Sequence, residues 1–384
     1  MDNRLATRSF RGTTGGAEHF ISVEATAGLD LAEQVALVET RYAEARQALG
    51  LAPETALFRR IFVSDAINQA ALIRDSDLFG EPADSPVAVS IVQQPPLPNA
   101  KIALLAYHVE SDAPVLKHRL SPKHLLVEKS GLTHLWSTRL CAGAYGSSAS
   151  VVAQTREIFG DLIDALSSQG GTLRDHCVRT WIYLKDVDVF YQGMVESRSE
   201  LFLRQGLTKD THYIASTGIE GACAHRYDLV AMDAYSILGL APRQMSHLND
   251  LDRLCLTKDY DVTFERGTRI AYADRSHHFI SGTASIDNAG RVVHPGDVVR
   301  QLDRALENVD AVLRSGSATL DDMMYFTVYL RDPTDLPRVD AYLSERFPGL
   351  PIVIVHAAVC RPEWLIEVEG VAVVANNDPG LPAF

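Results

Sequence analysis

The chain has 384 residues, a length that predicts two or three domains rather than one. Hydrophobic residues make up 46% of it and charged residues 22%, as in soluble globular proteins, and the net charge of −13 argues against nonspecific nucleic-acid binding, which needs a basic surface. No stretch stays apolar over the roughly 18 residues that a membrane-spanning helix needs, so we expect no membrane association.

Two further features of the sequence concern the cellular compartment. Residues 1–16 are polar and lack the apolar core of a signal peptide. The five cysteines are scattered, odd in number and without CxxC spacing, a pattern that favours reduced thiols over a disulfide framework. We therefore expect a cytoplasmic protein.

One sequence pattern occurs three times along the chain. Segments 34–65, 154–186 and 301–332 each begin with Gln, continue with apolar residues at helical spacing, and end in a β-rich run closed by Asp. In the third copy, for example, Leu302 and Leu306 stand four residues apart, as on one face of an amphipathic helix. Such self-similarity predicts three copies of one structural unit.

Each copy predicts the same order of elements: strand, strand, helix, strand, helix, strand, strand. Such a unit is an α+β layer in which two helices cover one face of a mixed sheet. Polar, proline-bearing segments at 111–130 and 240–262 mark the boundaries, so we expect units at 18–110, 131–239 and 262–375. Because a single unit leaves the other face of its sheet exposed, we expect the three to pack around a pseudo-threefold axis.

The third copy carries the motifs that point to a family. They are the segment 281–287 (SGTASID), Gln301, Glu307-Asn308, and the segments 328–332 and 365–369. Together they resemble the Rid (YjgF-like) superfamily, whose members are small trimeric proteins with active clefts between subunits. The resemblance is strong over the third unit, clear over the second and faint over the first. It implies a chain in which the family trimer is covalently fused.

The best-known members of that superfamily hydrolyse reactive enamines and imines. They use an arginine for the substrate carboxylate and a glutamate near the reacting bond. Glu367 matches the glutamate, whereas Val353 stands where the arginine is expected. The resemblance therefore implies a catalytic cleft that departs from the family's deaminases.

The segment from Cys360 to Glu367 is similar to a specialised branch of the fold, the chorismatases. Those enzymes cleave the enolpyruvyl ether of chorismate, releasing pyruvate together with a dihydroxycyclohexadiene acid or a hydroxybenzoate. In that branch a glutamate matching Glu367 is the acid, and a cysteine matching Cys360 accompanies hydroxybenzoate formation. The second unit is also chorismatase-like, in Arg179-Thr180-Trp181, Tyr191, Arg198 and the segment 215–219.

The residues themselves favour a catalytic role for Glu367. Alternate side chains on a strand share a face, so Glu367 and Glu369 lie next to each other. Adjacent, partly buried carboxylates raise each other's pKa, and a glutamate raised towards neutrality suits a general acid. The positions that match Glu367 are Ala231 and Ala103, as expected if only one cleft is catalytic. A structural ion pair is the alternative for Glu367, whereas Glu369 is matched by Asp233 and is expected to be structural.

The other candidate residues would bind or shape the substrate. Arg179 lies in an apolar strand, where its guanidinium must meet an anion, either a substrate carboxylate or an internal Asp or Glu. Cys360 would shape the cleft or donate weakly to substrate, and a buried structural cysteine is the alternative. Gly282 is expected to permit a close approach of the backbone. Further candidates for carboxylate binding, with solvated or structural roles as alternatives, are Arg198, Arg361, Tyr191, Ser216, Thr217 and Gly218.

No metal ion or cofactor is expected. His277 and His278 are adjacent in a predicted strand, so their side chains point to opposite faces. A metal site would need further His or carboxylate ligands at fixed spacing, and none stands near them.

These features predict a cofactor-free enzyme with one competent cleft, between the second and third units. There the arginines and residues 216–218 would bind the carboxylates of a small anionic enol ether, chorismate or a relative, while Glu367 protonates its methylene carbon. The alternatives are an enamine or imine deaminase, which would release ammonia, and a non-catalytic metabolite-binding protein. We expect a monomeric pseudotrimer, with a homodimer as the alternative, that binds neither nucleic acid nor membranes.

Overall fold

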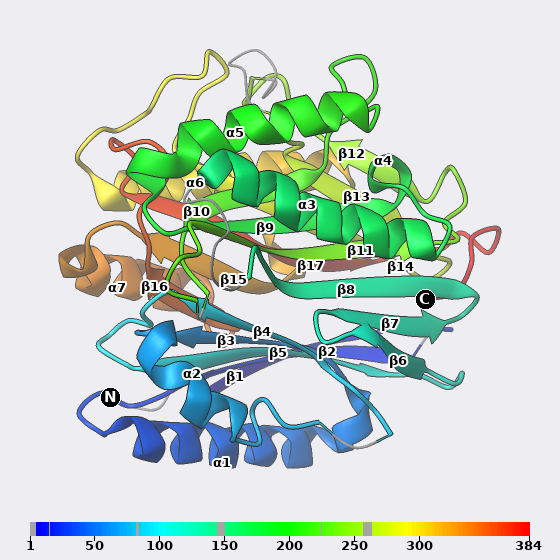
Figure 1. Cartoon of the computed structure of the whole chain (residues 1–384), viewed down its shortest axis with the longest axis horizontal. Coiled ribbons are helices and arrows are strands. Elements are labelled where there is room, and N and C mark those ends of the chain that lie inside the picture. Colours follow the sequence, from blue (N-terminus) through cyan, green and yellow to red (C-terminus); the bar gives the residue numbers. More distant parts are fainter. Residues whose placement is uncertain (1–4, 15, 82–83, 144–149, 224, 256–262) are drawn as a thin grey trace.

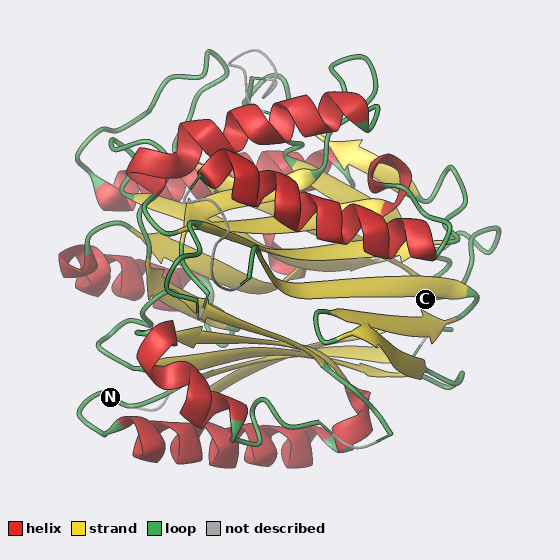
Figure 2. Ribbon diagram, viewed as in Figure 1, coloured by secondary structure: helices red, strands yellow, loops and turns green. Residues whose placement is uncertain are grey.

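The computed structural model describes residues 5–14, 16–81, 84–143, 150–223, 225–255 and 263–384. In this part of the chain three mixed β-sheets, of five, six and six strands, carry helices on their outer faces (Figure 1, Figure 2). Each sheet is built from one continuous stretch of sequence, which confirms three repeat-like α+β units. None of the described helices is long and apolar enough to cross a membrane.

The first unit has the strand order β1-β2-β5-β3-β4, in which β3 and β4 are parallel and the other neighbours antiparallel. Its helices are α1 (Leu31–Leu49) and α2 (Ala66–Arg74), with a 3-10 turn at Pro53–Thr55. Its strands are β1 (Leu5–Arg11), β2 (Ala17–Glu24), β3 (Ala56–Val63), β4 (Ala88–Gln93) and β5 (Ile102–Glu110).

The second unit has the order β10-β9-β11-β8-β7-β6, with β9 and β10 parallel. Its long helices α3 (Val151–Ser168) and α5 (Val187–Arg204) pack on each other, and the short α4 (Leu173–His176) precedes β9. Its strands are β6 (Leu116–Ser121), β7 (His124–Lys129), β8 (Leu132–Cys141), β9 (Cys177–Leu184), β10 (Ala215–Glu220) and β11 (Val230–Leu238).

The third unit repeats the order as β12-β13-β14-β17-β15-β16, with β15 and β16 parallel. Helix α6 (Val298–Ser315) lies against β14 and β17, and α7 (Leu336–Arg346) packs on α6. Its strands are β12 (Met245–Leu248), β13 (Gly267–Ala271), β14 (Arg275–Ala284), β15 (Met323–Leu330), β16 (Ile352–His356) and β17 (Ile366–Ala375).

The strand registers confirm which residues match between units. Glu367 on β17 pairs with Tyr329, three residues before the Asp that closes the repeat, and Ala231 on β11 pairs with Tyr183 in the same way. Ala103 on β5 again pairs with the residue three before that Asp, Phe62. A carboxylate therefore stands at this position in the third unit and alanine in the other two.

The glutamine that opens each repeat holds the start of the central strand. In the third unit the Gln301 side chain accepts from Leu365 N (2.8 Å) and donates to Glu363 O (2.9 Å). Gln154 likewise accepts from Leu229 N (2.7 Å), and Gln34 accepts from Lys101 N (2.7 Å). The amide satisfies backbone groups that a buried strand end would otherwise leave unpaired, so the residue recurs for a structural reason.

The units contact one another through equivalent strands. β4 of the first unit contacts β8 of the second, β10 of the second contacts β14 of the third, and β16 of the third contacts β2 of the first. Where the sheets face one another, Phe20, Trp136 and Phe279 occupy the same rung of each sheet. Their rings pack with Tyr107 and Tyr235 at centroid distances of 4.3–6.2 Å. This aromatic cluster is the common core of the three units.

Charged residues are buried beside that core in a network that spans all three units. Arg60 of the first unit lies 3.3 Å from Asp233 of the second and 3.7 Å from Glu369 of the third. Arg179 of the second unit contacts the same Glu369 at 2.6 Å, and the Trp181 indole donates to it at 2.9 Å. Each carboxylate thus meets a cation and further donors, which is the condition for burying charge.

The sheets begin earlier in the sequence than the expected unit boundaries. β1, the hairpin of β6 and β7, and β12 all precede the expected starts at residues 18, 131 and 262. The strand β6 is an edge strand whose residues are exposed or half-buried in alternation. Its polar composition reflects that edge position rather than a linker.

Candidate active site

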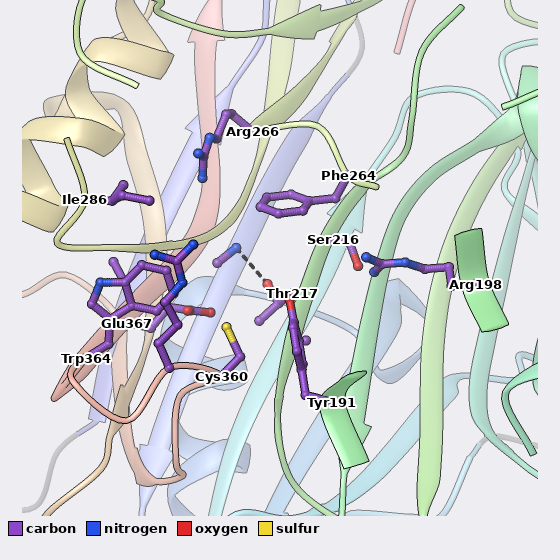
Figure 3. A pocket seen from close by; sticks show the side chains of 14 residues that line it. Tyr191, Arg198, Ser216, Thr217, Phe264, Arg266, Ile286, Cys360, Trp364 and Glu367 are labelled. Carbon is purple, nitrogen blue, oxygen red and sulfur yellow. Dashed lines mark hydrogen bonds between the residues drawn. The ribbon is translucent and has the colours of Figure 1, made fainter. Parts of the chain in front are cut away.

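A pocket lies between the second and third units, where β10 faces β14. Its empty volume, including the open mouth, is about 620 Å³. Figure 3 shows the side chains that converge on it from both units. Eight of the nine site residues expected from the sequence line this pocket: Tyr191, Arg198, Ser216, Thr217, Gly218, Cys360, Arg361 and Glu367.

The Glu367 carboxyl group lies on the wall supplied by the third unit. Its side chain is only 5% exposed, and none of the described residues donates a hydrogen bond to it. Burial first and the neighbouring charge of Glu369 second raise its pKa to about 8, while Arg179 and Arg266 act in the opposite direction. Glu367 is therefore protonated at neutral pH and can act as a proton donor.

Gly282 on β14 makes room for this carboxyl group. A Cβ atom at this position would lie 2.0 Å from Oε1 of Glu367 and 3.0 Å from Cγ2 of Thr217. The backbone N–H of Gly282 donates to the Thr217 hydroxyl at 2.9 Å, which joins β14 to β10 across the two units. The close approach expected for this glycine is confirmed, and it is an approach to the candidate acid.

Replacing Gly282 with alanine is expected to lower turnover without unfolding the protein. The new methyl group must push Glu367 out of position, and a displacement of about 1 Å at a reacting group costs about 10²-fold in rate. The matched control is Gly160→Ala on α3, where a Cβ atom meets nothing within 4 Å. Turnover by the Gly282→Ala variant at the wild-type rate would show that the position of Glu367 is unimportant.

Cys360 and Tyr191 lie together beside Glu367. Figure 3 shows the Cys360 thiol between the Glu367 carboxyl group and the Tyr191 ring. Burial and the neighbouring Glu367 raise the pKa of Cys360 to about 12, so it is a thiol rather than a thiolate at neutral pH. Burial also raises the pKa of Tyr191 well above its usual value. Both groups can therefore donate hydrogen bonds to a substrate, and neither is an anionic nucleophile.

Arg198 on α5 brings a buried positive charge to the wall supplied by the second unit. Its side chain is 2% exposed, and its Nε donates to the Thr263 hydroxyl at 3.2 Å. Its Nη2 has no hydrogen-bond partner among the described residues, and Figure 3 shows the guanidinium pointing into the pocket toward Ser216. A buried guanidinium with a free N–H group is suited to a carboxylate.

Five pocket residues were not expected from the sequence, and two of them, Phe264 and Arg266, lie close together in the chain. They follow the segment taken as a linker and precede β13, so they reach the pocket from the connection between the second and third units. Arg266 is 3% exposed and donates to the carbonyl of Cys255 at 3.2 Å. The one available signal was an arginine placed directly before a predicted strand. Arg266 gives the pocket a second buried guanidinium beside Arg198.

Arg361 lies at the mouth of the pocket. Its guanidinium stacks on the Trp364 ring at 4.6 Å and donates to the carbonyl of Gly290 at 2.9 Å. Trp364 also lines the pocket, because it lies in the turn before β17 and not on the strand whose alternation would turn it away. With Ala284 and Ile286 it forms the apolar part of the wall.

Arg179 is the exception among the expected substrate-binding residues. It does not line the pocket; its side chain is 1% exposed and contacts Glu369 and the Thr217 hydroxyl. Of the two partners considered from the sequence, a substrate carboxylate and an internal one, Arg179 contacts the internal one, Glu369. Arg179 therefore holds the wall of the pocket and is not available to a substrate.

Residues 216–218 lie on strand β10 and form no turn. The Ser216 N–H donates to the Ser281 hydroxyl at 2.9 Å, and its own hydroxyl accepts from Thr180 at 2.9 Å. The Thr217 hydroxyl donates to Glu369. Gly218 leaves space for the Tyr191 ring, which a Cβ atom would meet at 3.2 Å. Because these groups are engaged within the protein, their part in the pocket is to shape it.

Comparison with known proteins shows the family. A RutC family protein of Pyrococcus abyssi (strain GE5 / Orsay) is 33% identical over 96 residues, which are 24% of this chain and 76% of that protein. The chain belongs to the Rid family. The family described as Endoribonuclease L-PSP matches residues 270–374, which form most of the third unit of this Rid protein.

Two longer similarities extend beyond one Rid unit. The 3-hydroxybenzoate synthase of Streptomyces hygroscopicus is 27% identical over 272 residues, 64% of this Rid chain and 77% of that enzyme. The crystal structure of a chorismatase superposes with a TM-score of 0.64 at 18% identity, over 97% of this chain and 99% of that one. The Rid fold in three repeat-like units is thus shared over almost the whole chain.

Proposed function

We propose that the pocket between the second and third units cleaves the enol ether of chorismate or a close relative and releases pyruvate. The observation that carries the proposal is that one pocket contains both a buried, protonated Glu367 and the buried guanidinium of Arg198. The similarity to a 3-hydroxybenzoate synthase supports the same substrate class.

Chorismate carries two carboxylates, one on the ring and one on the enolpyruvyl group. Arg198 supplies a buried guanidinium whose Nη2 is unpartnered among the described residues and can bind a carboxylate, and Arg266 adds a second buried positive charge to the pocket wall. Ala284, Ile286 and Trp364 provide an apolar surface for the ring. The pocket thus offers both positive charge for the anionic groups of chorismate and apolar surface for its ring.

The chemical step begins with proton transfer from Glu367 to the methylene carbon of the enol ether. The double-bond electrons form the new C–H bond, the methylene becomes a methyl group, and the ether oxygen stabilises the cation. Glu367 becomes a carboxylate and attracts this cation. Correctly placed general-acid catalysis is worth about 10²–10⁴-fold.

The cation then breaks down by one of two routes. In the first, water attacks the side-chain carbon, and the bond between the ether oxygen and that carbon breaks to release pyruvate. Capture by water consumes one water molecule and leaves a dihydroxy acid. In the route without water, the neighbouring ring hydroxyl attacks the ring carbon that bears the ether and gives its proton to the Glu367 carboxylate. The bond between that ring carbon and the ether oxygen breaks, pyruvate leaves with this oxygen as its keto oxygen, and the epoxide left on the ring opens to a hydroxybenzoate. The thiol of Cys360 and the hydroxyl of Tyr191, beside Glu367, are donors that can hold the ring hydroxyl in place. We propose the hydroxybenzoate as the product.

The register argues against the enamine deaminase. Val353, at the position where the family's arginine is expected, pairs with Thr327. The matching pair of the second unit is Trp181 and Thr217, so Thr217 occupies the position of Val353 in that unit. Thr217 is the residue at this position that lines the pocket of Glu367. The arginine of the deaminases is thus absent from both positions. Arg198 reaches the pocket instead from a helix.

The test is to incubate the purified protein with chorismate and to follow pyruvate with a coupled lactate dehydrogenase, while the aromatic co-product is identified by chromatography. Pyruvate together with a hydroxybenzoate is expected. Ammonia released from amino-acid-derived enamines, with no pyruvate from chorismate, would contradict the proposal and support the deaminase.

The raised pKa of Glu367 predicts a falling pH–rate profile. A general acid is active when protonated, so kcat/KM is expected to be flat at neutral pH and to fall about tenfold per unit above the pKa of about 8. The measurement is kcat/KM for pyruvate release from pH 6 to 10. A rate that rises through this range would show instead that Glu367 works as a carboxylate.

A further inference from the structure

The cleft between the first and second units is the counterpart of the candidate active site. It lies where β4 contacts β8, as β10 contacts β14 in the site described above. Cys141 pairs with Ala231 just as Ala284 pairs with Glu367, so Cys141 stands beside the position at which this cleft lacks the acid. The pocket here has an empty volume of about 630 Å³ including its mouth, and Cys141 and His225 line it together with the cationic side chains of Arg74, Lys123 and Arg139.

Three side chains in this cleft bring together groups that bind metal ions. Sγ of Cys141, Nδ1 of His225 and a carboxylate oxygen of Asp228 all lie within 4.8 Å of one another. Sγ is 4.0 Å from Nδ1, and Nδ1 is 3.5 Å from Oδ2 of Asp228. The thiol and the carboxylate approach the same ring nitrogen, whereas a catalytic relay through histidine uses both nitrogens. The arrangement converges on one point, as ligands of an ion do.

Asp228 gives independent support for a bound cation. Its side chain is 1% exposed, and neither carboxylate oxygen receives a hydrogen bond from an N–H or O–H group of the described residues. Its polar neighbours are the Cys141 thiol and the half-exposed His225 ring. The charges of Lys123 and Lys185 also act on Asp228, but Lys123 is itself paired with Asp161 at 2.9 Å and the Lys185 ammonium donates to the carbonyl of Arg226 at 2.8 Å. A carboxylate buried in this way calls for a further positive charge.

The donor set selects the kind of ion. Thiolate, imidazole and carboxylate are the ligands of Zn²⁺, with Zn–S near 2.3 Å and Zn–N near 2.0–2.1 Å. Tetrahedral angles at these bond lengths place sulfur and nitrogen roughly 3.5 Å apart and nitrogen and oxygen roughly 3.3 Å apart. The observed separation of sulfur and nitrogen, 4.0 Å, would need to shrink by about 0.5 Å, and that of nitrogen and oxygen, 3.5 Å, by about 0.2 Å. One thiolate and one carboxylate also balance the charge of a divalent ion.

We propose that the cleft between the first and second units binds a divalent transition-metal ion of the Zn²⁺ class through Cys141, His225 and Asp228. The sulfur ligand disfavours Mg²⁺ and Ca²⁺, which take oxygen ligands. Three protein ligands leave one coordination position for water. The site contains none of the residues assigned to enol-ether cleavage and stands independently of that function.

The test uses the full chain, reduced, treated with a chelator and then titrated with Co²⁺ followed by Zn²⁺. One equivalent of Co²⁺ is expected to give thiolate-to-metal charge-transfer absorption and the d–d bands of a tetrahedral site, which Zn²⁺ then removes. Cys141→Ser is expected to abolish the charge-transfer absorption, and Asp228→Asn to weaken binding at least about tenfold. Cys360→Ser, which removes the thiol of the other cleft, is expected to bind as the wild type does.

Absence of the charge-transfer absorption in the wild-type protein would overturn the proposal, as would its persistence in Cys141→Ser. Circular dichroism checks that each variant is folded. Should Cys141→Ser fail to fold, His225→Gln decides, because the His225 side chain is 43% exposed and its replacement opens no core cavity. Unchanged Co²⁺ affinity in that variant would equally overturn the proposal.

Discussion

Replacing Glu367 with glutamine is expected to lower kcat for pyruvate release from chorismate by between about 10² and 10⁴-fold. Glutamine keeps the size of the side chain and is neutral, as the protonated Glu367 is below its pKa of about 8. The pocket and the substrate contacts should therefore be preserved while the transferable proton is lost. We expect an unchanged dissociation constant for chorismate, measured by calorimetry with the inactive variant.

The matched control is Glu363→Gln, four residues earlier, where the side chain is exposed. This variant removes a carboxylate that lies just before β17 and does not line the pocket, so it should leave kcat unchanged. A Glu367→Gln variant that turns over chorismate at the wild-type rate would exclude Glu367 as the acid. A variant that fails to bind chorismate would show instead that Glu367 acts in binding.

Replacing Arg198 with methionine is expected to raise KM for chorismate by about 30- to 1,000-fold, with a smaller effect on kcat. Methionine preserves most of the apolar volume and deletes the buried charge. Truncating one partner of a buried, hydrogen-bonded charge pair costs about 2–4 kcal/mol, and about 1.4 kcal/mol corresponds to a factor of ten. Steady-state kinetics of pyruvate release separates KM from kcat.

Arg204→Met is the control for this prediction, since Arg204 is exposed at the end of the same helix, α5. Its KM should match that of the wild type. If Arg198→Met binds chorismate as well as the wild type does, the carboxylates are bound by other groups. Arg266 would then be the next residue to test.

The repeat of the sequence could be predicted because the residues that define it have structural duties in every unit. Gln34, Gln154 and Gln301 each accept a hydrogen bond from the backbone N–H group just before the central strand of their unit. Asp65 and Asp186 each cap the helix that follows, a local duty that the sequence itself specifies. Positions that perform the same backbone task in each unit keep the same side chain, and this makes a repeat visible.

The candidate acid could be predicted for the opposite reason. Glu367 breaks the repeat at a position where the other two units have alanine, whereas Glu369 follows it with Asp233. The structure places Glu369 in the buried charge network and Glu367 in the pocket. A carboxylate present in only one of three equivalent positions is therefore the better candidate for chemistry.

The exact set of pocket arginines could not be predicted, because it depends on which unit faces which. An arginine in a buried strand, such as Arg179, needs an anion, but the sequence does not say whether the anion is internal. Arg266 reaches the pocket from the residues just before β13, where no site residue was expected. Both questions are decided by the packing of the units and not by the local sequence.

The metal-binding cluster was hidden for a similar reason. Cys141 is 84 residues from His225 in the sequence, so no short spacing motif joins them. From the sequence, the pair His277-His278 was considered as metal ligands instead. In the structure, His277 contacts Glu18 and His278 contacts the carbonyl of Gly316. Cys141 lies at the end of β8, and His225 and Asp228 lie in the loop before β11, so only the folded sheet brings these residues together.

The most direct test of the central claim is the stereochemistry of the methyl group of the released pyruvate. Chorismate with one deuterium at a defined position of its methylene group is turned over in tritiated water, and the pyruvate is trapped at once as lactate. Because Glu367 is fixed on one wall of the pocket, protonation on the enzyme should occur from a single face and give a chiral methyl group. A racemic methyl group would mean that enolpyruvate leaves first and is protonated in solution, which would contradict Glu367 as the acid.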